Sequence, residues 1–74
     1  MQIEVRLFAY LRDGRFKRQT MELPEATRLG DIVRQLEIPA ARLSLALVNG
    51  QFSPMERQLQ PRDVVSLFPP VAGG

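Results

Sequence analysis

The side chains of this sequence offer little for catalysis, and its most reactive candidate is the end of the chain. There are no cysteines and no histidines, which removes disulfides, thiolate nucleophiles, Cys/His zinc sites and imidazole bases. The last six residues are Pro69, Pro70, Val71, Ala72, Gly73 and Gly74. An end without side chains can enter a channel too narrow for any other residue. The candidate reactive group is therefore the α-carboxylate of Gly74.

Two prolines connect this tail to the rest of the chain. Pro69 and Pro70 cannot donate hydrogen bonds to a neighbouring strand, and they favour stiff, extended polyproline geometry. Six extended residues after Phe68 would reach about 20 Å at ~3.3 Å each. Residues 69–74 are thus predicted to form a short arm with a stiff root and a narrow tip. The alternative is a chain end without function, because Gly-Gly alone is weak evidence.

Alternating apolar residues predict the strands that must position this tail. In the first strand, the predicted core face carries Ile3, Val5, Leu7 and Ala9, and the other face carries Glu4, Arg6, Phe8 and Tyr10. Gly14 supplies a turn, and residues 18–23 return as the second strand of a hairpin. In the last strand, residues 64–68, Val65 and Leu67 face one way, while Phe68 faces the other.

One helix and a second hairpin are predicted between these strands. The helix has an apolar stripe of Leu29, Ile32, Val33 and Leu36, a candidate N-cap at Thr27, and Pro39 as a barrier to extension beyond about Ile38. Gly30 is expected to allow close approach to the sheet. Asn49-Gly50 predicts a type I′ hairpin that Phe52 continues, and Leu59 is expected to anchor the following loop.

Together these elements predict one α+β domain over residues 1–74, with a mixed sheet of four or five strands packed against one helix. Residues 1–68 would form the globular core and residues 69–74 the tail. A domain of 74 residues has little room for both a core and a walled pocket, so catalysis by this chain alone is not expected. No metal site is expected either.

Charge and hydropathy limit the classes of partner that we expect. The net charge is +2, and the basic residues gather in a predicted loop at Arg12, Arg15, Lys17 and Arg18. An anion or nucleic-acid contact is conceivable, but a solvated loop is favoured because no aromatic platform accompanies the cluster. We expect no nucleic-acid partner. No apolar run approaches a membrane span and no secretory signal opens the sequence, so a cytoplasmic location is expected.

The segments "VRLFAYLRD", "VNGQ" and "LQPRDVVSLFPPVAGG" resemble the MoaD/ThiS sulfur carriers, which are ubiquitin-like β-grasp proteins. The resemblance covers essentially the whole chain and is strongest in the terminal "PPVAGG". The Pro-Pro-Val root is more typical of the small subunit of molybdopterin synthase than of the thiamine-pathway carriers. One departure is Arg62-Asp63, where the family usually has Gly-Asp before the last strand.

The resemblance implies a mechanism carried by the main chain. An E1-like adenylating enzyme would use ATP to activate the carboxylate of Gly74, and sulfur would replace the activated oxygen to give a thiocarboxylate. The tail would then enter the large subunit of molybdopterin synthase and donate sulfur to cyclic pyranopterin monophosphate. The small protein itself would bind no cofactor.

The resemblance also gives a role to three aromatic residues. Phe8 and Phe68 fall on the predicted non-core face of neighbouring strands, and Phe52 is expected to extend the same apolar patch. Hydrophobic residues at these matching positions contact the partner enzymes in the family. The alternative is that loops or the chain end cover them.

Three other functions remain open from the sequence. The chain is compatible with a sulfur carrier for thiamine, cysteine or another metabolite. It is also compatible with a protein modifier that joins Gly74 to lysines, as ubiquitin does. Finally, a β-grasp binding domain whose tail has no role would show the same core pattern.

Overall fold

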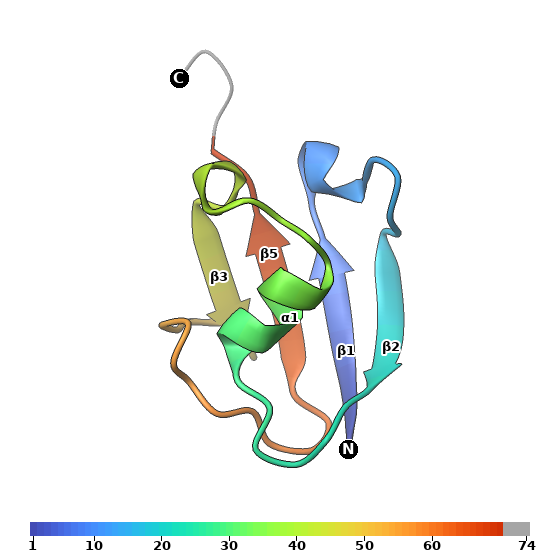
Figure 1. The fold of residues 1–74 in the computed structure, drawn as a ribbon, viewed down its shortest axis with the longest axis vertical. Helices are drawn as coiled ribbons and strands as arrows, with labels where there is room; N and C mark the ends of the chain where they lie inside the picture. The colour runs from blue at the N-terminus through green and yellow to red at the C-terminus, as the bar shows by residue number, and fades with distance from the viewer. Residues whose placement is uncertain (71–74) are drawn as a thin grey trace.

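The computed structural model describes residues 1–70, in which five strands and one α-helix are found. The sheet and the helix form two layers (Figure 1). The elements are β1 (Gln2–Leu7), the 3-10 helix η1 (Ala9–Arg12), β2 (Arg18–Glu22), α1 (Leu29–Gln35), the 3-10 helix η2 (Ala40–Arg42), β3 (Leu45–Val48), β4 (Gln51–Phe52) and β5 (Val64–Phe68). The strand order is β2-β1-β5-β3-β4. Only the central pair β1 and β5 is parallel among the described strands. The predicted α+β architecture is confirmed.

The core lies between α1 and one face of the sheet. Ile3, Val5 and Leu7 of β1 are fully buried, as are Val65 and Leu67 of β5. Alternation therefore identified the correct core face in both strands, because successive strand side chains point to opposite faces. Leu59, which was expected to anchor its loop, is also buried, as are Met21 and Leu23.

The first strand is shorter than predicted. It ends at Leu7, and the 3-10 helix η1 follows, so Ala9 and Tyr10 are exposed rather than placed on strand faces. Ala9 has φ +52°. The turn returns Leu11 to the core, where it is 1% exposed. Leu11 continues the apolar positions 3, 5, 7 and 9 in the sequence, although it reaches the core through a 3-10 turn and not through a strand. Alternation alone therefore could not distinguish this turn from a longer strand.

The N-terminal end of α1 also differs from the prediction. Arg28 is the N-cap residue, and its backbone N–H donates to Oδ2 of Asp31 at 2.8 Å. Thr27 lies one residue earlier and donates its hydroxyl to the carbonyl oxygen of Pro24 at 2.7 Å. Its hydroxyl is therefore used to close the preceding turn, and it does not cap the helix.

At its other end α1 stops before the limit set by Pro39. The N–H of Glu37 donates to the carbonyl of Arg34 at 3.0 Å, and that of Ile38 to the carbonyl of Val33 at 3.1 Å. These two bonds form a Schellman motif, which needs a left-handed residue at Glu37, here with φ +57°. Leu36, the last residue of the predicted stripe, is the C-cap and is half-buried.

Gly30 allows a close approach, but not to the sheet. A Cβ at this position would lie 3.3 Å from both the Cβ and the carbonyl oxygen of Met55. The N–H of Gly30 donates to that carbonyl oxygen at 2.9 Å. Gly30 therefore brings the loop after β4 against α1.

The turn chemistry around Asn49-Gly50 joins two parts of the chain. Asn49 and Gly50 have φ +53° and +81°, as a type I′ turn requires, which confirms the predicted hairpin. Nδ2 of Asn49 donates to Oδ1 of Asp63 at 2.8 Å, and the N–H of Val64 donates to Oδ1 of Asn49 at 2.9 Å. Arg62, which precedes Asp63 in the turn before β5, takes φ +71°, a left-handed conformation that glycine adopts more readily.

Candidate functional site

The face of the sheet opposite α1 carries a pair of stacked aromatic rings. Phe8 follows β1 and Phe68 ends β5, and their ring centroids lie 4.2 Å apart with an interplanar angle of 10°. Both rings are half-buried. The parallel pairing of Leu7 with Leu67 puts the next residue of each strand side by side. The prediction that these two phenylalanines share the non-core face is confirmed.

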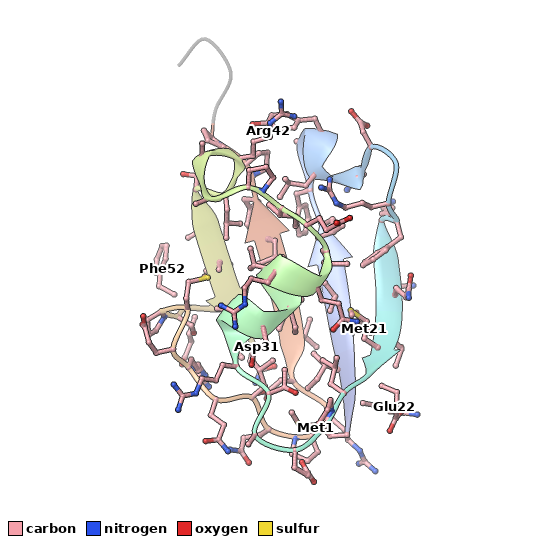
Figure 2. All side chains as sticks on the ribbon, viewed as in Figure 1. Met1, Met21, Glu22, Asp31, Arg42 and Phe52 are labelled. Carbon is pink, nitrogen blue, oxygen red and sulfur yellow. The ribbon has the colours of Figure 1, made fainter. Side chains whose placement is uncertain are left out.

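Phe52 extends this face toward the edge of the sheet. It is 79% exposed and projects away from the body of the molecule (Figure 2). It pairs with Leu47 of β3, while Leu45 of the same strand pairs with Phe68. Paired residues in a sheet point to the same face, so the two leucines bridge the space between Phe52 and Phe68. We call Phe8, Leu45, Leu47, Phe52 and Phe68 the aromatic face.

Leu45 and Leu47 are the members of this face that sequence reasoning missed. Residues 45–48 are all apolar, so no alternation of polar and apolar residues shows which of them face the core. The hairpin register would have decided it. In a two-residue Asn49-Gly50 turn, Leu47 faces Phe52, and so an exposed Phe52 would predict an outward Leu47.

Basic residues flank the aromatic face at the end of β1. A cavity of about 530 Å³ is lined by Arg6, Leu7, Phe8, Arg12, Lys17 and Arg18. The guanidinium carbon of Arg12 lies 5.7 Å from the centroid of the Phe8 ring, and its Nε donates to the carbonyl of Leu7 at 2.8 Å. Arg6 forms an ion pair with Glu4 at 2.5 Å. Four of the six residues that line the cavity are therefore basic, and one of these four, Arg6, is paired with a carboxylate.

Arg15 does not join the other basic residues of its loop. Its guanidinium donates to the carbonyl oxygens of Leu11, Leu36 and Glu37 at 3.1 to 3.2 Å. The last two are carbonyls at the C-terminal end of α1, which a cation stabilises. The basic loop is thus partly structural, with Arg15 on the helix side and Arg12, Lys17 and Arg18 at the cavity.

The root of the tail follows directly from the stacked rings. The N–H of Ser44 donates to the carbonyl of Phe68 at 2.9 Å, and that of Phe8 donates to the carbonyl of Leu67 at 3.1 Å. Pro69 is half-buried and Pro70 is exposed. The remaining predicted tail residues, Val71, Ala72, Gly73 and Gly74, lie outside the described residues.

Within residues 1–70, the side chains do not assemble a catalytic or metal centre. No group of three or more Asp, Glu, His or Cys residues is placed to hold a metal ion in this range. The described helices also include none that is long and apolar enough to cross a membrane. What the described site offers is an apolar surface, a basic cavity beside it, and a strand that leads from both to Pro69 and Pro70.

Comparison with known proteins finds one matching family. The family model described as the ThiS family matches residues 5–74. No curated protein sequence matches the chain significantly.

Solved structures share the fold over nearly the full length. A protein assigned as molybdopterin converting factor subunit 1 from Pyrococcus furiosus is 25% identical, with a TM-score of 0.79, over 96% of this chain and 99% of that one. SAMP1 from Haloferax volcanii is 22% identical, with a TM-score of 0.79, and the alignment covers 100% of both chains. Complete mutual coverage also holds for a structure from a complex of subunits 1 and 2 of molybdopterin-converting factor from Helicobacter pylori (22%, 0.69). The predicted ubiquitin-like β-grasp fold is thereby confirmed.

Proposed function

The chain belongs to the ThiS family of small ubiquitin-like sulfur carriers, and from this premise we propose that it carries sulfur for molybdopterin synthesis. The observation that supports the proposal most directly is the continuity of β5. This strand is central in the sheet, bears Phe68 on the aromatic face and leads straight into Pro69 and Pro70. A partner that covers the aromatic face would therefore hold the start of residues 71–74 at its own surface.

In the proposed reaction, the protein supplies an end group and its partners supply the catalysis. An E1-like enzyme adenylates the carboxylate of Gly74 with ATP, and a sulfur donor converts the acyl adenylate to a thiocarboxylate. The absence of cysteine from the sequence is compatible with this chemistry, because the sulfur is carried on the main chain. Gly73 and Gly74 leave the tip narrow, while Ala72 and Val71 set its reach from the prolines.

Delivery would follow in a second complex. The tail enters the active site of the large subunit of molybdopterin synthase and gives its sulfur to cyclic pyranopterin monophosphate. The molybdopterin branch is favoured by the Pro-Pro-Val root and by the likeness to the Pyrococcus furiosus subunit, which is 25% identical. All of these steps would take place in the cytoplasm, with no cofactor bound to this chain.

The aromatic face is the proposed docking surface for both partners. Phe8, Phe52 and Phe68 present apolar area beside the root of the tail, and aromatic residues contribute disproportionately to protein interfaces. An apolar surface can serve two enzymes in turn because it needs few directional contacts. The carrier would thus dissociate from the first before it binds the second.

A mass measurement tests the proposal. The protein is incubated with an E1-like adenylating enzyme, ATP and a sulfur donor, and the intact mass is expected to show one oxygen exchanged for sulfur. Deletion of Gly74 should abolish the exchange without changing the circular dichroism spectrum, whereas Gln51→Ala, on the opposite face, should not affect it. An unchanged wild-type mass under these conditions contradicts the carrier function.

Two alternatives differ in the fate of the same end group. A carrier for thiamine or another sulfur metabolite would undergo the same mass change but would not convert cyclic pyranopterin monophosphate with a large synthase subunit. A protein modifier would instead give a ladder of conjugates on denaturing gels of cell extract. The fold likeness to SAMP1 keeps this second alternative in view, although at 22% identity it supports the fold alone.

A further inference from the structure

The chain carries its positive charge almost entirely on arginine. Nine of its ten basic residues are arginines, and Lys17 is its one lysine. A guanidinium stays protonated and does not act as a nucleophile, whereas a neutral lysine amine attacks activated acyl groups. If Gly74 is activated as an acyl adenylate, the amines on the surface of other copies are possible acceptors. Lys17 is the one side chain of the sequence that can react in this way.

The α-amino group of Met1 is the other candidate amine, but it is engaged. It donates to the carbonyl oxygen of Leu23 at 2.6 Å and lies 3.6 Å from Oε1 of Glu22. Met1 and Glu22 lie together at one end of the sheet (Figure 2), and the side chain of Met1 is 1% exposed. An ammonium group that is hydrogen-bonded and ion-paired has to lose both interactions before its nitrogen lone pair can attack.

Lys17 lies in a setting that attracts an anion. It is exposed, and its carbonyl accepts from the N–H of Leu7, which places it at the C-terminal end of β1. It lines the cavity of about 530 Å³ together with Arg6, Arg12 and Arg18. An acyl adenylate carries a negative phosphate next to its reactive carbonyl, so neighbouring guanidinium groups would draw it toward this wall. The glycines of the incoming tail add no side chain that the cavity must admit.

We propose that Lys17 is the acceptor site for the activated carboxyl end of a second copy of this chain. The inference rests on the proposed activation of Gly74. The neutral Nζ of Lys17 attacks the Gly74 carbonyl carbon of the acyl adenylate, and a C–N bond forms. The bond between that carbon and the phosphate oxygen breaks, AMP leaves with the electron pair, and the amine releases one proton to water. The product is an isopeptide-linked dimer.

The experiment omits the sulfur donor so that the adenylate persists. The full chain is incubated with the E1-like adenylating enzyme and ATP, and pyrophosphate release is measured in the same samples as intact mass. The expected product has twice the mass of the chain less one water. After trypsin, residues 16–18 should carry residues 63–74 on Lys17, because the last arginine of the sequence is Arg62.

Two variants decide whether the site is specific. Lys17→Arg keeps the charge and should form no dimer while it releases pyrophosphate at the wild-type rate. The double variant Lys17→Arg with Arg62→Lys moves the amine to the opposite end of β1, where the N–H of residue 62 donates to the carbonyl of Gln2. This double variant should form at least tenfold less dimer than the wild type, because its amine is far from the basic cavity.

Each other outcome overturns the proposal in a distinguishable way. Pyrophosphate release without any dimer refutes Lys17 as an acceptor but leaves the activation of Gly74 intact. A monomer lighter by one water shows that the tail has reached an amine of its own chain instead. If the double variant forms as much dimer as the wild type, the basic cavity does not direct the reaction. Without pyrophosphate release from any variant, both this inference and the proposed function are wrong.

Discussion

A mutation of Phe52 can test partner binding with little effect on the stability of the fold, because Phe52 is more exposed than Phe8 and Phe68. Its side chain is 79% exposed, so its removal should change the free energy of unfolding by less than about 0.5 kcal/mol. Complete burial of a phenylalanine contributes about 1.5–3 kcal/mol. If a partner covers the exposed 79%, Phe52→Ala should lose about 1.2–2.4 kcal/mol of binding free energy. At 1.4 kcal/mol per tenfold change, affinity should fall by about 7- to 50-fold.

Isothermal titration calorimetry with a large synthase subunit and with an adenylating enzyme would measure this loss. Gln51→Ala is the matched control, since Gln51 adjoins Phe52 in β4 but pairs with the core residue Val48 and therefore faces the other way. Urea denaturation of both variants checks that the fold is unchanged. Wild-type affinity of Phe52→Ala for both partners would refute the aromatic face as a docking surface.

Two further predictions concern the stability of the fold. Asp63→Ala should lower the free energy of unfolding by about 3 kcal/mol in urea denaturation, because the buried carboxylate accepts from Asn49 Nδ2 and from the N–H of Gln60, both at 2.8 Å. The exposed Asp13→Ala is its control, and equal effects would argue against the network. Glu37→Gly should raise stability by about 0.5–1 kcal/mol, seen as a higher Tm, because glycine adopts φ +57° without strain. A lower Tm would contradict this.

The features that could be predicted from the sequence each depend on a short stretch of residues whose pattern is compatible with one local structure. Alternation located the core faces of β1 and β5, and from these the shared face of Phe8 and Phe68. Asn49-Gly50 specified its turn because both residues tolerate positive φ. The end group proposed to react also rests on a local pattern, prolines followed by small residues, and its role stays a prediction.

Other features depend on contacts between distant segments, and no local pattern contains them. Arg15 is bonded to carbonyls at the end of α1, and Gly30 adjoins Met55, so neither role can be read from the neighbours in sequence. Ala9 and Glu37 have positive φ, and each precedes a residue that returns to the core, Leu11 and Ile38 respectively. Intrinsic propensity disfavours both, which is why the strand and the helix were predicted to be longer.

The position of β5 has a consequence for how the protein is made. Because β5 lies between β1 and β3, the hairpins formed by residues 2–22 and 45–52 are joined in one sheet only when residues 64–68 are present. Each two-stranded hairpin alone is marginal in water. Folding of the sheet on the ribosome must therefore wait until residues 64–68 have emerged. A copy that terminates before residue 64 would lack this central strand as well as the end proposed to react, so it could not complete the sheet and its chain would stay open to proteolysis.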